Sequence, residues 1–141
     1  MKRALPFVFA ALLLPGVAFA KGKPPVTGPG SHGKSAPKVV YVLKGTLSGY
    51  TAYDSSTSTN GSITIVVSHA NYHGKALKTQ TLTFPVGSKT RITLANGVST
   101  VTDNDKGMVT VRAPKRIAAA DLASTLQTYS ARHVIDKGIS S

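Results

Sequence analysis

Alternation of apolar and polar residues with a period of two runs through the chain from Lys38 onward. This period is the signature of β-strands that bury one face. The clearest run is 62–68, where Ile63, Ile65 and Val67 alternate with Ser and Thr. Similar runs predict further strands at 39–49, 81–86, 91–94, 108–113 and 129–135. The part of the chain from Lys38 is therefore predicted to be all-β. The residues that share the inward face of these runs are predicted to form the core: Ile63, Ile65, Val67, Leu82, Phe84, Ile92, Val109 and Val111.

The segments between these runs carry turn and helix signals. Asn60-Gly61 and Asn96-Gly97 suit tight turns, because Asn and Gly tolerate positive φ. A polar turn is expected at 103–107, before the fifth strand. The Ala-rich stretch 117–126 is predicted to form one or two helical turns.

Five or six short strands with one short helical segment favour a small OB-like, partly open barrel. Closure removes the sheet edges that a small open sheet would expose to aggregation. Gly45 and Gly49 interrupt the long first strand, and glycine within a strand often marks a bulge or bend. An immunoglobulin-type sandwich is the alternative, but it usually has about seven strands.

The N-terminus predicts export. Lys2 and Arg3 precede an apolar run at 4–14, and Ala18-Phe19-Ala20 supplies small residues for cleavage. A basic start, an apolar stretch of roughly 7–15 residues and an A-x-A end describe a secretory signal peptide. A membrane anchor would need roughly 20 apolar residues. Cleavage after Ala20 is expected, with no transmembrane helix in the remaining chain.

Residues 21–37 are rich in Gly, Pro and Lys, with Val26 as the one large apolar residue. Such a segment buries too little surface to offset its ordering entropy, so it is predicted to be a disordered, cationic tail. It is either a spacer from a membrane or wall, or a leader without a specific partner. The predicted organisation is a signal peptide at 1–20, the flexible tail at 21–37 and a β-barrel domain at 38–141.

The composition excludes several classes of site. The chain has no cysteine, so disulfides, thiolate nucleophiles and zinc–thiolate sites are absent. The chain has seventeen Lys and Arg residues but only five acidic residues, all aspartates, which gives a formal charge of +12. A field of this sign attracts polyanions without a shaped pocket.

A family resemblance accompanies these patterns. It rests on the order of VLKGTL (42–47), GSITI (61–65), LTFPV (82–86), TRI (90–92), KGMVTV (106–111) and SARHV (130–134). This order resembles secreted bacterial OB-like β-barrel domains of unknown function that are common in actinobacteria, over residues 40–136. The family usually shows Gly-Asp where this chain has Gly107-Met108, and Asp103 or Asp105 is a possible substitute. The resemblance implies a fold and an extracytoplasmic location, and it brings no catalytic residues.

Two short motifs have metal-ligand spacing. His69 and His73 form an H-x3-H pair, which aligns two imidazoles only on a helix. The segment 69–73 follows a predicted strand and is followed by Gly74, so ordinary loop histidines are expected rather than a helical pair. The stretch 103–107 resembles the start of a calcium loop, but the EF-hand pattern needs a later Glu, which the chain lacks. We therefore expect no metal site and no cofactor.

Catalytic signals are absent from the sequence. No G-x-S-x-G context frames a serine. A paired-carboxylate mechanism would have to use aspartates that all lie in predicted turns or flanks. We therefore expect a non-enzymatic protein, with a small secreted hydrolase as the least favoured alternative.

Eight basic residues of the predicted barrel are candidates for contact with polyanions. They are Lys75, Lys78, Lys89, Arg91, Arg112, Lys115, Arg116 and Arg132. The leading hypothesis is a monomeric, secreted or envelope-associated β-barrel module that acts in interaction or structure, with an unknown partner. The alternative is a binder of anionic surface polymers or extracellular nucleic acid, which would need these groups to cluster on one face.

Overall fold

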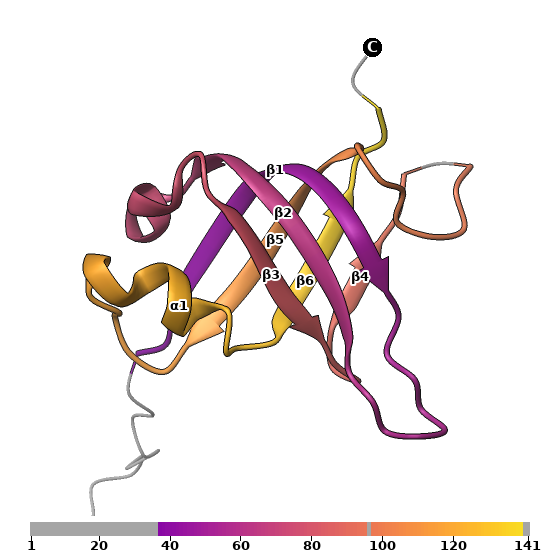
Figure 1. The fold of residues 1–141 in the computed structure, drawn as a ribbon, viewed down its shortest axis with the longest axis horizontal. Coiled ribbons are helices and arrows are strands. Elements are labelled where there is room, and N and C mark those ends of the chain that lie inside the picture. Colours follow the sequence, from indigo (N-terminus) through magenta and orange to yellow (C-terminus); the bar gives the residue numbers. More distant parts are fainter. Residues whose placement is uncertain (1–36, 96, 140–141) are drawn as a thin grey trace, which may run out of the picture. The chain divides into compact units, whose positions relative to one another are not determined.

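The computed structural model describes residues 37–95 and 97–139, which form one curled sheet with short helical segments (Figure 1). The strands are β1 (Val39–Thr51), β2 (Gly61–Ala70), β3 (Thr81–Val86), β4 (Arg91–Thr93), β5 (Lys106–Ala113) and β6 (Ala131–Asp136). The helical segments are the 3-10 helices η1 (Tyr72–Leu77) and η2 (Ala119–Asp121) and the α-helix α1 (Leu122–Leu126). The predicted all-β class with a short helical segment is confirmed.

The strand order explains why the sheet curls. Its order is β3-β2-β1-β5-β6-β4, and all neighbours are antiparallel except β4 and β6. β3 and β4 therefore occupy opposite edges, although only residues 87–90 separate them. A flat sheet of this size would place its edges about 24 Å apart, whereas a link of this length reaches roughly 17 Å. The two edges must approach each other, which gives the predicted partly open barrel.

Side-chain hydrogen bonds join β3 and the link that follows it to the segment from α1 to β6. The backbone amide of Thr83 donates to Oε1 of Gln127, just after α1, at 2.9 Å. Thr90 Oγ1 accepts from the amide of Gly87 at 2.9 Å and donates to the carbonyl of Ala131 at 2.6 Å. These bonds take the place of ladder hydrogen bonds along this seam.

The predicted glycine bends lie in β1. Its pairing with β2 shifts register between Lys44 and Gly45 and again between Ser48 and Thr51. A Cβ at Gly45 would lie 1.8 Å from the carbonyl oxygen of Val66, so the two backbones approach too closely for any other residue. Gly49 has φ +58°, a conformation that favours glycine. These irregularities let one long strand bend and pair on both sides.

The core fills the inner face of the sheet. Of the eight residues predicted from alternation to be in the core, seven are buried: Ile63, Ile65, Val67, Leu82, Phe84, Val109 and Val111. The eighth, Ile92, is half-buried on the short edge strand β4 and packs against the core. Leu122 and Leu126 of α1 are also buried. The sequence alternation therefore predicts the strand register correctly.

The structure differs from the prediction mainly at element ends. η1 was not predicted; it is fixed at its start by Asn71, whose Oδ1 accepts from the amide of Gly74 at 3.2 Å. The helical stretch predicted from Ile117 begins only at Ala119, and the last strand begins at Ala131 rather than Tyr129. Short-range patterns do not record the long-range contacts that fix such ends.

The predicted signal peptide at 1–20, and the tail up to residue 36, lie outside the described residues. Among residues 37–95 and 97–139, no helix has the length and apolar character needed to cross a membrane.

Candidate functional site

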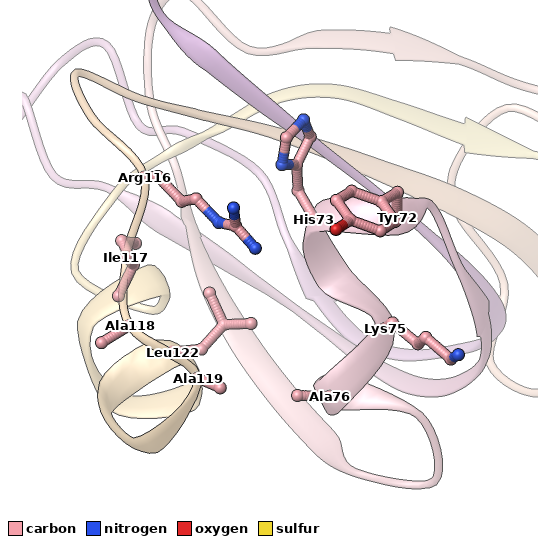
Figure 2. Close-up of a pocket in the computed structure, with 9 residues that line it drawn as sticks. All are labelled: Tyr72, His73, Lys75, Ala76, Arg116, Ile117, Ala118, Ala119 and Leu122. Carbon is pink, nitrogen blue, oxygen red and sulfur yellow. The ribbon is translucent and has the colours of Figure 1, made fainter.

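A groove of about 700 Å³ lies between η1 and the segment that leads into α1 (Figure 2). One side is formed by η1 residues: Tyr72, His73, Lys75 and Ala76. The other side is formed by 116–119, with Leu122 of α1. Two segments that are distant in sequence therefore face each other across one hollow.

Both sides of the groove are attached to the same strand, β1. Asn71, just before η1, donates from its backbone amide to the carbonyl of Val42 at 3.0 Å, and from Nδ2 to the carbonyl of Val40 at 2.8 Å. On the other side, the amide of Ile117 donates to the hydroxyl of buried Tyr41 at 3.1 Å. Three consecutive residues of β1 thus hold the two sides at a fixed separation.

An exposed aromatic ring and a cation dominate the groove. Tyr72 is 77% exposed, and the guanidinium carbon of Arg116 lies 5.8 Å from its ring centroid. The His73 ring stands edge-on to Tyr72, with centroids 5.6 Å apart, and also edge-on to Tyr41 at 6.2 Å. A cation over an aromatic face is attracted to it by about 0.5–1 kcal/mol at exposed sites. The exposed ring is therefore ordered by its neighbours yet remains open to a ligand.

The charge of the groove is positive. Lys75 and Arg116 line it, and the residues that line it include no aspartate. A neighbouring hollow shares Tyr72 and Lys75 and adds Lys78 and His69. Basic groups therefore continue from the groove along the outer side of η1.

The eight predicted basic residues do not form one patch. Lys75, Lys78 and Arg116 lie at or beside the groove, and Lys115 precedes Arg116 in the chain. The others lie on the sheet or at its seam: Lys89 and Arg132 line a separate hollow, Arg91 pairs with His133 on β6, and Arg112 pairs with Val40 on β1. The sequence identifies the basic residues of both regions, but it does not indicate that the two regions lie apart.

The two histidines with metal-ligand spacing are separated by structure. His69 lies on β2, paired with Lys44, whereas His73 lies on η1 beside Tyr41 and Tyr72. In the described part of the chain, no group of three or more His or Asp side chains is placed to hold a metal ion. His73 lines the groove, whereas His69 lines the neighbouring hollow.

Two aspartates in the predicted turns and flanks are buried: Asp105 just before β5, and Asp136 at the end of β6. Asp105 and Asp136 are each 2% exposed, and Oδ1 of Asp105 has no hydrogen-bond partner. Asp136 accepts from the amides of Gly138 at 2.8 Å and Thr102 at 3.1 Å. Burial raises the pKa of Asp105, and the neighbouring carboxylate of Asp136 raises it further. The polar turn predicted at 103–107 thus directs one of its two carboxylates inward.

Sequence reasoning missed several residues that structure brings together. Tyr72 and His73 appeared only as part of a loop, because η1 has no apolar periodicity. Lys44, Lys106 and Lys137 were not among the predicted basic residues, although they line a common hollow. Extending the alternation of β5 backwards from Val109 through Gly107 would have placed Asp105 inward and Lys106 outward.

Comparisons of the chain with protein-family models, curated proteins and solved structures give no match. The resemblance to secreted actinobacterial barrels remains a prediction from the sequence.

Proposed function

We propose that the protein is a non-enzymatic, secreted or envelope-associated binding module, and that its groove holds a segment of an anionic surface polymer. The observation that carries this proposal is the Arg116 guanidinium placed over the exposed ring of Tyr72, with Lys75 nearby. Arg and Lys pair with phosphate groups, and an exposed tyrosine offers an apolar surface with a polar tip. Together these groups suit a chain in which charged and apolar parts alternate.

The form of the groove supports an extended ligand. The groove continues into the hollow beside Lys78 and His69, with which it shares Tyr72 and Lys75. A small molecule bound in an enclosed pocket loses most of its exposed surface. A path of connected surface hollows instead favours a polymer segment.

The chemistry of the groove supports binding rather than catalysis. Its titratable residues are Tyr72, His73, Lys75 and Arg116, and its lining includes neither an acidic residue nor a Ser or Thr hydroxyl. A hydrolytic site needs a nucleophile, a base and an orienting group within hydrogen-bond reach. The export signal at 1–20 and the excess of basic residues suit a partner outside the cytoplasm.

Phosphodiester-linked glycerol or sugar polymers are the partners that this arrangement favours. Single-stranded nucleic acid requires stacking platforms for successive bases. Tyr72 is the one exposed tyrosine in the groove, and it is already partnered by Arg116. Nucleic acid is therefore an alternative outcome of the binding test.

The test compares the exported protein with its Arg116→Gln variant, using fluorescent glycerol-phosphate oligomers and a dT oligomer of equal charge. We expect Arg116→Gln to weaken binding of the glycerol-phosphate oligomer about tenfold, the equivalent of about 1.4 kcal/mol. Arg112→Gln removes the same charge from the β5 surface and should change the affinity less than about twofold, because it lies outside the groove. Equal losses in both variants would contradict a groove site, and a preference for the dT oligomer would replace the polymer class.

A further inference from the structure

A second hollow, of about 410 Å³, gathers basic side chains from adjacent strands. Lys44 of β1, His69 of β2, Lys106 of β5 and Lys137, just after β6, all line it. It has no lining residue in common with the groove between η1 and α1. The four basic groups come from sequence positions that only the sheet register brings together. We call this feature the lysine hollow.

The sheet pairing places basic residues next to one another. Lys44 is the Cα partner of His69 in the pairing of β1 with β2, and Lys106 lies beside Lys137. The amide of Lys137 donates to the carbonyl of Lys106 at 2.8 Å, and the amide of Lys106 donates to Gly138 at 3.1 Å. Like charges directly opposite each other destabilise a sheet. This arrangement is therefore not explained by stability.

The nearest acidic residues in sequence lie on the other side of the sheet. Asp105 precedes Lys106 and Asp136 precedes Lys137, but both aspartates are buried on the inner face. Alternation along the strands directs each carboxylate inward and each lysine outward. No carboxylate lines the hollow, so its lysines are available to an anion from solution.

We propose that the lysine hollow is a binding site for a compact phosphate-type anion. Ammonium groups from Lys44, Lys106 and Lys137 would surround the phosphate oxygens, and His69 would line the side next to β2. Lysine binds phosphate as a point charge with three donors, so several lysines around one hollow suit a multivalent oxyanion. The phosphate has two possible sources: a free polyphosphate, or a phosphate group within a longer polymer.

A path of shared residues connects this site to the groove. The hollow beside Lys78 shares Tyr72 and Lys75 with the groove, and it shares His69 with the lysine hollow. A polymer seated on Tyr72 could therefore place a later phosphate among the three lysines. The lysine hollow does not depend on the groove, because it stands on its own residues.

The experiment is a titration of the exported protein with inorganic tripolyphosphate, followed by backbone amide chemical shifts. We expect saturable shifts at 44–46, 106–107 and 137, and small shifts at 72–76. Lys106→Gln/Lys137→Gln should weaken binding at least about tenfold, because two charge-assisted contacts are lost. Lys89→Gln/Arg132→Gln removes the same charge from another hollow and should change the affinity less than about twofold.

Lys44→Gln tests the hollow from β1 without altering the contact between β5 and β6. It should also weaken tripolyphosphate binding, by about threefold to tenfold. Equal losses in the Lys89→Gln/Arg132→Gln control, or shifts confined to the groove, would overturn the site.

Two further measurements separate this proposal from the groove proposal and identify the phosphate source. Tyr72→Ala should weaken binding of the glycerol-phosphate oligomer but leave the tripolyphosphate affinity unchanged. If the oligomer also loses affinity in Lys106→Gln/Lys137→Gln, the phosphate belongs to the polymer. If only tripolyphosphate does so, the site takes free polyphosphate. Loss of tripolyphosphate binding in Tyr72→Ala would overturn the independence of the lysine hollow.

Discussion

The inner and outer surfaces of the same strands follow opposite rules. The inner surface is filled by large apolar side chains such as Tyr41, Leu47 and Phe84, all fully buried. The outer surface carries Lys44, Lys106 and other polar groups that face solvent. Every inner position is constrained by the side chains that surround it, whereas an outer position is constrained only by its cross-strand neighbours. The outer surface is therefore where this fold can carry a binding function at little cost in stability.

The two surfaces also differ in how they treat charge. On the inner surface, Asp105 and Asp136 lie buried near each other, and one oxygen of Asp105 has no hydrogen-bond partner. On the outer surface, the three lysines of the hollow remain accessible to solvent ions. Burial makes the acidic pair costly, while solvent screening makes the basic group tolerable.

The largest expected effect tests the inner surface. Phe84→Ala should lower the free energy of unfolding by about 3–5 kcal/mol, because the side chain is fully buried and its loss leaves a cavity. Denaturant unfolding measures the change. Val66→Ala, on the outer surface of β2 and 45% exposed, is the control and should cost less than about 1 kcal/mol. Similar losses in both variants would show that the two surfaces do not differ as described.

The next largest effect comes from backbone contact. Gly45→Ala should cost about 1–3 kcal/mol, because its Cβ would lie 1.8 Å from the Val66 carbonyl oxygen and β1 would have to move away from β2. In Gly87→Ala the nearest atom, Oδ1 of Asn60, would lie 3.4 Å from the new Cβ, so this control should be close to neutral. Thermal unfolding of both variants makes the comparison. If Gly45→Ala unfolded at the same temperature as the parent, the strands would be less closely paired at this bend than described.

Asp105→Asn is expected to increase the stability of the protein, by an amount that depends on pH. The raised pKa of Asp105 means that the native protein loses stability as pH rises from about 4 through that pKa, since the buried group must then ionise. Asn stays neutral, so the variant should unfold at a higher temperature than the parent at pH 7. The difference should disappear below about pH 4, where the parent group is protonated in both states.

Asp54 separates this effect from ordinary acid unfolding. Hydrogen bonds from the side chain and backbone of Ser56 and from Thr57 lower the pKa of Asp54 to about 2. The contribution of ionised Asp54 to stability is present above about pH 4 and is lost as pH falls towards 2. This loss should be equal in the parent and in Asp105→Asn. Asp121→Asn, at an exposed position, is the control for charge removal. A constant difference between Asp105→Asn and the parent across pH would contradict the role of ionisation.

The smallest effect on stability is expected in the groove. Tyr72→Ala should change the free energy of unfolding by less than about 0.5 kcal/mol, because the ring is largely exposed. Denaturant unfolding compares Tyr72→Ala with Tyr41→Phe. Tyr41→Phe removes the hydroxyl that accepts from the amide of Ile117. Tyr41→Phe should cost about 1 kcal/mol. A costlier Tyr72→Ala would show that the ring has a structural role.

The fold could be predicted from the sequence because alternation is a local signal. β3 has its predicted bounds, and the inward residues of β2 are those that the pattern indicates. The sites could not be predicted in the same way. Arg116 reaches Tyr72 only because β1 holds both segments, and Lys44 meets Lys106 only through the strand register. Such contacts join residues that are far apart in the chain, and no local pattern records them.

The central place of β1 has a consequence for how the chain folds. As the chain is synthesised from its N-terminus, β1 gains β2 early, but its other neighbour, β5, begins only at Lys106. Pairing over such a sequence distance is slow, and an unpaired strand edge is a template for other chains. Until β5 is made, one edge of β1 is unpaired and open to wrong pairing. Lys44 in the middle of this strand is a charge of the kind that discourages wrong pairing, and it is present on the strand before the lysine hollow is assembled.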